Sequence, residues 1–253
     1  MAMYVYKDKE RNEKLYANNA SKEDKGIRFY CPNPKCDAHM YICSVDGFSS
    51  AHFKAKYKQY QHVANCPFHF SNGFNPNEHD EDAFNFENAV KNLMLTNNHI
   101  ERKYTSNIHD TNKVNATKKP LRTIRQIYDM CKSFVCTDEY NHVTIGQMLL
   151  DNRSAYMYPK GVFGYRIIEG MAIRGRFYDS DKLEIKIAAP ITDLTYKFIL
   201  KFDEEALFKQ ARNMIFANRE KIIIAAGEWK PSGRFNVFYT DVKNKKQMSV
   251  INQ

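Results

Sequence analysis

Three cysteines and two histidines in the first third of the chain have the residue types and the spacing of zinc ligands. Cys31 and Cys36 form one close pair, and Cys66 forms a second pair with either His62 or His69. Structural zinc takes four thiolate and imidazole ligands in a tetrahedron, and chains usually supply them as two close pairs. The spacing of His62 and Cys66 suits one turn of a helix, whereas a tight turn after Cys66 would suit His69. The sequence therefore predicts a Zn²⁺ site, with His62 as the first choice for the fourth ligand and His69 as the alternative.

The other three cysteines, Cys43, Cys131 and Cys136, do not fall at a complete ligand spacing. Six cysteines in this arrangement fit a reducing compartment better than a disulfide framework. In that setting, the alternative to a metal site is that the first three are buried thiols acting as small apolar groups. The N-terminal segment lacks the apolar core of a signal peptide, and no apolar run is long enough to span a membrane. We therefore expect a cytoplasmic protein without a membrane partner.

The segments around these ligands predict a small β-rich module. Two β-like runs flank the turn dipeptide Asp46-Gly47, which favours a hairpin. A metal held between two knuckles that a hairpin joins is typical of a zinc ribbon. Apolar residues at helical spacing over residues 86–94 predict a helix, which we expect to pack on the metal module because a ribbon alone has little core. We assign residues 1–104 to this zinc-binding module.

A polar linker and a helical connector follow. Residues 105–120 are polar and without periodicity, which indicates a linker. Two helices are predicted after it, the second over residues 144–153. The apolar stripe of the first consists of Leu121, Ile124, Ile127, Tyr128 and Cys131. The connector is therefore assigned to residues 105–155.

From residue 156 the pattern changes to β. Over residues 170–190, apolar and polar side chains alternate on both sides of a turn at residues 179–181, which predicts a hairpin with one buried face. A strand, an amphipathic helix, a buried strand and a closing hairpin follow. This order is that of an OB-fold barrel, whose helix lies between the third and fourth strands. We predict an α+β protein in which residues 156–253 form an OB-like β-barrel.

The basic excess of the chain increases toward its C-terminus. The formal net charge of +9 divides into 0 for residues 1–100, +3 for residues 101–154 and +6 for residues 155–253. Such an excess indicates a polyanionic partner, most simply nucleic acid, although it also describes a solubilising surface. OB barrels bind single strands by stacking bases on aromatic rings and tracking phosphates with cations. The candidate contacts for single-stranded DNA are Arg174, Arg176, Tyr178, Lys182 and Lys186, with Lys197, Trp229, Lys230, Arg234 and Phe238 flanking them. For Trp229, packing in the core is the alternative.

The N-terminal arrangement resembles a known family. A cysteine pair, a His-Phe segment, His62, Cys66 and a following helix, within roughly residues 28–100, resemble the zinc-binding front end of CoiA-like competence proteins and related proteins of phages and mobile elements. The resemblance implies a DNA-processing context. CoiA-like proteins also carry a nuclease-like domain of the PD-(D/E)xK kind, which needs an aspartate on one strand and an acid-x-lysine on the next to bind magnesium.

Asp181 with Glu184 and Lys186 is the candidate for such a nuclease site. The few residues between Asp181 and Glu184 leave little freedom to bring both carboxylates to one ion. The chain contains no GxSxG, Walker loop, GxGxxG or HExxH motif. We therefore predict a non-catalytic nucleic-acid-binding protein. The alternatives are the nuclease and an adaptor that engages a host or replication protein.

Overall fold

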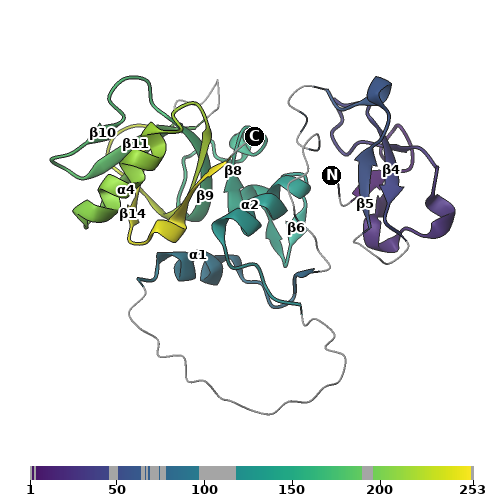
Figure 1. Cartoon of the computed structure of the whole chain (residues 1–253), viewed down its shortest axis with the longest axis horizontal. Helices are drawn as coiled ribbons and strands as arrows, with labels where there is room; N and C mark the ends of the chain where they lie inside the picture. The colour runs from purple at the N-terminus through teal and green to yellow at the C-terminus, as the bar shows by residue number, and fades with distance from the viewer. Residues whose placement is uncertain are drawn as a thin grey trace, which may run out of the picture. The chain divides into compact units, whose positions relative to one another are not determined.

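The chain folds into two units, each of which combines distant parts of the sequence. The computed structural model describes residues 2, 4–45, 51–63, 66, 68, 74, 78–96, 118–189 and 196–251. One unit consists of residues 1–77 and 125–160, and the other of residues 78–124 and 161–253. Both units contain helices and strands (Figure 1), which confirms the predicted α+β class.

The first unit begins with an antiparallel five-stranded sheet in the order β2-β1-β3-β4-β5. The predicted hairpin is formed by β4 and β5, which pair from Met40↔Ala55 to Cys43↔His52; its Asp46-Gly47 turn lies outside the described residues. Because the metal-ligand segments extend from this five-stranded sheet, the narrower prediction of a zinc ribbon is not confirmed. The strands are β1 (Tyr4–Tyr6), β2 (Lys14–Tyr16), β3 (Phe29–Tyr30), β4 (His39–Cys43) and β5 (His52–Ala55), and short 3-10 turns η1 (Ala17–Asn19), η2 (Lys22–Asp24) and η3 (Lys58–Tyr60) follow β2 and β5.

The second part of this unit is built on α2 (Ile124–Ser133). The predicted apolar stripe of α2 is buried, with Ile127 and Cys131 at 0% exposure. A short hairpin of β6 (Glu139–Tyr140) and β7 (Val143–Thr144) follows, so the connector is not purely helical. The predicted second helix is only one turn, α3 (Ile145–Met148), before β8 (Leu149–Leu150) and η5 (Ala155–Met157).

A buried ion cluster centred on Asp151 follows α3 and β8 in the chain. The Asp151 carboxylate, at 0% exposure, accepts from Arg153 Nε at 2.7 Å and Lys132 Nζ at 3.0 Å. Arg153 also donates to the carbonyls of Phe134 and Cys131 at the end of α2. Burial alone would raise the pKa of Asp151, but the charges of Arg153 and Lys132 outweigh it and hold that pKa below its ordinary value.

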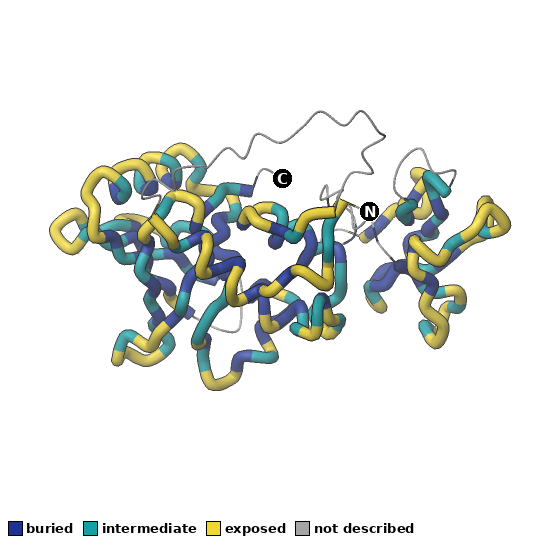
Figure 2. Tube along the Cα trace, turned by 90° about the horizontal axis from the view of Figure 1, so that it is seen from below, coloured by how far each residue is buried: buried dark blue, intermediate teal, exposed yellow. Residues whose placement is uncertain are grey.

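The second unit contains a closed five-stranded β-barrel, compatible with the OB-like barrel predicted. Around the barrel the order is β9-β11-β12-β14-β13 and back to β9, with β12 and β14 parallel and the other neighbours antiparallel. Buried and more exposed residues alternate along β11, β12 and β14, whereas β9 and β13 contain runs of four and five consecutive buried residues. Figure 2 shows the buried and exposed stretches along the trace. The strands are β9 (Gly164–Ala172), β11 (Glu184–Ala188), β12 (Lys197–Phe202), β13 (Ile222–Pro231) and β14 (Val237–Val242), and β10 (Tyr178–Asp179) and β15 (Met248–Ile251) add to β11 and β13.

Two glycines allow the barrel strands to approach closely. A Cβ atom on Gly170 of β9 would lie 3.0 Å from the carbonyl oxygen of Ala188 on β11, where the barrel closes. A Cβ atom on Gly227 of β13 would lie 2.1 Å from Thr240 Oγ1 on β14. Larger side chains at either position would push neighbouring strands apart.

The helices of this unit cover the barrel. As predicted, residues 86–94 form a helix, α1 (Phe86–Met94). It packs on β13, β9 and the turn η6 (Lys245–Gln247), so the expectation that it would cover the metal module is wrong. An amphipathic stripe shows that a helix needs an apolar partner but does not say which one. The helix α4 (Glu205–Phe216) connects β12 to β13 and contacts β11 and β12.

The predicted linker, residues 105–120, falls mostly outside the described residues. Within the part of the chain that the structure describes, no helix has the length and apolar character needed to cross a membrane.

Candidate metal centre and basic barrel groove

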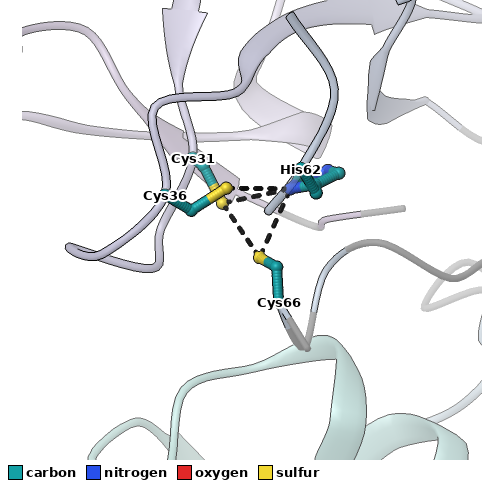
Figure 3. A group of neighbouring side chains, drawn as sticks. All are labelled: Cys31, Cys36, His62 and Cys66. Atoms are coloured by element: carbon teal, nitrogen blue, oxygen red, sulfur yellow. Dashed lines mark hydrogen bonds between the residues drawn. The ribbon is translucent and has the colours of Figure 1, made fainter. Parts of the chain in front are cut away.

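Four predicted ligands converge in the first unit. One ligand atom from each of Cys31, Cys36, His62 and Cys66 lies within 4.8 Å of the others, and all four residues are buried. In Figure 3 the three sulfur atoms and the imidazole point toward one another from separate segments. Among the described residues, this is the only cluster of three or more His, Cys, Asp or Glu side chains suited to a metal ion. His69, the alternative ligand, lies outside those residues.

The spacing of the four atoms fits a tetrahedral ion. His62 Nδ1 lies 3.5 Å from Cys31 Sγ, 3.4 Å from Cys36 Sγ and 3.3 Å from Cys66 Sγ, and Cys31 Sγ lies 3.7 Å from Cys66 Sγ. Ordinary zinc bond lengths in a tetrahedron give about 3.6 Å between nitrogen and sulfur and about 3.8 Å between two sulfurs. The four distances above lie close to these values, and all four ligand atoms lie within 4.8 Å of one another, so the residues present can bind such an ion.

Arg11 fixes the first ligand pair. Cys31 follows β3, and a turn closed by a hydrogen bond from Cys36 N to the Asn33 carbonyl (3.0 Å) brings Cys36 back beside it. The Arg11 guanidinium donates to the carbonyls of Cys31 (3.2 Å), Asn33 (3.1 Å) and Cys36 (3.3 Å). One side chain thus holds both ends of the knuckle. The sequence analysis missed it because Arg11 lies 20 residues from Cys31 in the chain.

The second pair is held by local contacts. His62 follows η3, where the Gln61 side-chain amide donates to the carbonyls of Tyr57 (2.9 Å) and Ala55 (3.3 Å). Cys66 N donates to the Val63 carbonyl at 3.1 Å, so Cys66 turns back toward the cluster. Its sulfur also lies 3.5 Å from Asn33 Nδ2, which donates to it from the first knuckle.

The electrostatics of the cluster favour a bound cation. A hydrogen bond from Cys31, assisted by donors on His62 and Asn33, lowers the pKa of Cys66 to about 3. The same Cys31–Cys66 hydrogen bond, together with burial, raises the pKa of Cys31, and burial raises that of Cys36. One thiolate is thus stable among three sulfurs, because three negative charges repel one another in a buried site. A bound divalent cation would offset the repulsion between the thiolates, since thiolates are its ligands.

The remaining cysteines do not form a second site. Cys131 lies in the core of α2, where burial raises its pKa to about 12. Cys136 lies near the Arg153 carbonyl and the Tyr156 hydroxyl. In the described residues neither joins a further cluster of metal-binding side chains.

The second candidate site is a basic groove on the outer face of the barrel. It is a hollow of about 170 Å³ between β11, β12 and the loop before β14. Its lining consists of Lys182, Glu184, Lys186, Ile199, Lys201, Ser232 and Arg234. Within the described ranges, none of these four cations forms a salt bridge, although Glu184 lies among them. We call this surface the lysine groove.

The predicted residues divide between the groove and other places. Lys182, Lys186 and Arg234 line the groove. Lys197 is exposed at the start of β12, in register with Val237 of β14. Lys230 is exposed on β13, where it pairs with Glu228 at 3.3 Å.

The alternation predicted that Arg174, Arg176 and Tyr178 share the groove face with Lys186. In the structure they do not. The strand β9 ends at Ala172, and Gly175 has a φ of 79°, so the extended pattern stops. Tyr178 is in register with the buried Ile185 and therefore faces the opposite side of the hairpin from Lys186. Its ring packs 6.4 Å from Phe208 of α4.

Trp229 and Phe238 do not lie where the predicted contacts with single-stranded DNA would need them. Both are buried in the barrel core, Trp229 with 1% exposure. The Trp229 indole donates to the Arg166 carbonyl at 3.1 Å and packs edge-on against Phe198 at 5.1 Å. Enclosed rings cannot stack on a ligand, so Trp229 takes the core role given as its alternative.

One residue of the lysine groove and two beside it were missed. Lys201 and Tyr239 project outward from β12 and β14, and the Lys201 ammonium lies 4.1 Å from the Tyr239 ring centre. Phe235, next to Arg234 in the loop before β14, is 91% exposed. Alternation within Lys197–Phe202 and Val237–Val242 was the signal that could have placed Lys201 and Tyr239 on the outer face.

The candidate nuclease residues Asp181, Glu184 and Lys186 lie in a turn and on the groove face. Asp179 Oδ1 accepts the backbone N–H groups of Asp181 and Lys182 and so stabilises the turn. Asp181 is exposed, and Glu184 and Lys186 lie on the groove face of β11. No observation on these residues favours catalysis over a role in the turn and the groove.

A test of the metal centre follows from its ligand set. Cys66→Ser should abolish retention of one metal ion per chain and unfold the first unit, because the binding energy of structural zinc, about 10–16 kcal/mol, is coupled to folding. Metal content by mass spectrometry of the native protein and thermal melting measure both effects. Cys43→Ser is the matched control, since Cys43 is a free cysteine outside the cluster. Full metal content in Cys66→Ser would contradict the assignment.

The role of Arg11 can be tested separately. Arg11→Lys keeps the charge but loses the fork that reaches three carbonyls. We expect metal affinity to fall by about 10–100-fold, as for other residues that orient ligands. Competition with a chromophoric chelator measures the affinity, and Lys9→Gln, an exposed neighbour, should leave it unchanged. Equal affinities of Arg11→Lys and the unsubstituted protein would show that the knuckle needs no such clamp.

No protein-family model matches this chain, and the curated proteins and solved structures compared with it give no significant match. The resemblance of its N-terminal region to CoiA-like proteins therefore stays a prediction. What the chain does has to be inferred from its own two sites.

Proposed function

We propose that the chain is a zinc-containing nucleic-acid-binding protein whose barrel binds single-stranded DNA. The observation that carries this proposal is the lysine groove, where Lys182, Lys186, Lys201 and Arg234 converge and none of them forms a salt bridge among the described residues. Four cations against the one carboxylate of the lining, Glu184, leave a positive excess in the hollow, which favours a polyanionic ligand.

The barrel supports the proposal because its connectivity is compatible with an OB fold. Numbered within the barrel, the strands run 1-2-3-5-4-1, with a helix between the third and fourth. OB folds bind oligonucleotides on the face of strands two and three and on the neighbouring loops. The lysine groove lies on these two strands, β11 and β12, and on the loop between the fourth and fifth, β13 and β14.

Aromatic residues beside the groove favour a single strand over a simple polyanion. Tyr239 lies in register with Ile199 on the outer face, and Phe235 is almost fully exposed in the adjacent loop. An exposed phenyl ring gains nothing in water but stacks well on an unpaired base. Cations would thus follow the phosphates while the two rings take bases.

The metal has a structural role in this proposal. Four buried protein ligands complete a tetrahedron and leave no open position for a substrate, which is the pattern of structural zinc. Three thiolates and one imidazole favour zinc over magnesium or calcium, which prefer oxygen. The ion would stabilise the first unit and take no part in the groove.

The biological setting rests on the sequence alone. A DNA-processing role in a phage or mobile element, with a host or replication protein as partner, is implied by the resemblance of residues 28–100, and the choice of DNA over RNA comes from the same source. Six free cysteines agree with a cytoplasmic location. The metal-dependent nuclease remains the alternative activity, without an observation in its favour.

The groove can be tested by removing two of its charges. In the double variant Lys186→Gln/Lys201→Gln, affinity for a labelled oligothymidylate of about 12 nucleotides should fall at least about tenfold at low salt, and the slope of log K against log salt should decrease by about 1.4. Fluorescence anisotropy of the full-length protein measures both. Lys9→Gln/Lys22→Gln removes two exposed lysines of the first unit and should change neither quantity markedly. Unchanged binding by the groove variant would refute the assignment.

Stacking makes a different prediction for Phe235. Phe235→Ala should weaken oligothymidylate binding by roughly 1–3 kcal/mol while leaving the salt slope unchanged, because a base contact is lost and no phosphate contact is. The thermal midpoint should stay constant, since the ring is 91% exposed. Phe235→Leu keeps an apolar side chain without a ring face. If Leu restored the affinity, stacking would be the wrong explanation.

A further inference from the structure

Three arginines outside the lysine groove gather around aromatic rings of the same barrel. The Arg176 and Arg212 guanidinium carbons lie 5.7 and 5.5 Å from the Tyr178 ring centre. Arg219 lies 5.2 Å from the Phe177 ring centre and donates to the Gly175 carbonyl. These contacts join the loop before β10 to α4 and the segment that follows it. We call Arg176, Arg212 and Arg219 the arginine cluster.

The charges of this cluster are not compensated. Across the described ranges, none of the three arginines forms a salt bridge, in contrast to Arg125 and Arg153 of the first unit. Of the carboxylates near them in the chain, Glu205 pairs with Lys209 at 2.8 Å, and Asp179 accepts backbone N–H groups of its own turn. Among the described residues, the polar partner of Arg212 is the Asn213 side-chain oxygen, at 3.1 and 3.3 Å.

The chemistry of the cluster suits phosphate. A guanidinium held against a ring face loses less freedom on binding, and its N–H edge stays available for two parallel hydrogen bonds to phosphate oxygens. Lysines, which dominate the groove, interact with phosphate as point charges instead. Arginines arranged in this way are typical of a surface that fixes a phosphodiester backbone.

The cluster and the lysine groove share one hairpin. Tyr178 of β10 is in register with the inward-facing Ile185 of β11, whereas Lys186 faces the groove. In Figure 1, α4 lies beside β10 and β11, in agreement with the contacts of α4 with β11. The edge of β10 away from β11 pairs with no strand in the described part of the chain. A ligand that leaves the groove at Lys182 can therefore pass around this edge to the arginines.

We infer that the arginine cluster binds the phosphates of the same single strand after it bends around the β10 edge, an inference that rests on the proposed function of the groove. Such a bend selects the ligand by its flexibility. Duplex DNA, with a persistence length of about 150 base pairs, resists turning around a two-stranded hairpin, whereas a single strand does not. The two surfaces together would distinguish single strands from duplexes without reading any base.

The test compares ligand lengths. Full-length protein carrying Arg176→Gln/Arg212→Gln/Arg219→Gln should bind an oligothymidylate of about 5 nucleotides as the unsubstituted protein does, because this ligand fills only the groove. It should bind one of about 15 nucleotides at least about tenfold more weakly, with a salt slope lower by about 2. Lys209→Gln, which removes a paired charge from the same helix, should affect neither length.

Arg212→Gln alone guards against misfolding of the triple variant, since Arg212 does not hold the Gly175 loop and its loss should still weaken only the longer ligand. Equal binding of the longer ligand by all variants, or equal losses for both lengths, would overturn the inference. So would an equal loss for a duplex or for heparin, which would indicate a general polyanion surface. If the unsubstituted protein bound neither oligonucleotide, the proposed function of the groove itself would fail.

Discussion

The parallel pairing of β12 with β14 is the contact on which the lysine groove of the barrel depends. It runs over six residues, from Lys197↔Val237 to Phe202↔Val242. Parallel neighbours need a crossover, which α4 and β13 supply. The pairing places Tyr239 beside Ile199 and delivers Arg234 and Phe235 to the rim of the β11–β12 face. Lys186, Lys201 and Arg234, distant in sequence, meet in one hollow for this reason.

The metal centre bears on the stability of the first unit. The sheet of the first unit has strands of two to five residues, and such short pairings bury little apolar surface. An ion bound by four buried side chains ties together segments that these strands alone would hold weakly. Arg11 extends the same function, because its guanidinium donates to three carbonyls of the first ligand pair and its turn and so holds Cys31 and Cys36 together. On the proposed function, stability in one unit and recognition in the other would rest on separate chemistries.

Features with local signals could be predicted from the sequence. Ligand spacing identified Cys31, Cys36, His62 and Cys66, and apolar periodicity identified the helices α1 and α2. The order of strands and helix identified the closed barrel. Each of these depends on residues close together in the chain or on a regular repeat.

Features set by long-range packing could not be predicted. The partner of α1 depends on which apolar surface lies nearby, and the stripe on the helix does not specify it. The positive φ of Gly175 ended an alternation that had placed Arg174, Arg176 and Tyr178 with Lys186. Arg212 and Arg219 meet Tyr178 and Phe177 only through the fold, and an amphipathic helix pattern carries no sign of that meeting.

Hydrogen–deuterium exchange of the metal-loaded, full-length protein with and without an oligothymidylate tests the central claim most directly. If the barrel recognises the strand and the metal centre is structural, protection on binding should appear in residues 182–188, 197–202 and 232–239. Exchange around residues 29–66 should stay the same. Protection confined to residues 29–66, with the barrel unchanged, would contradict the account.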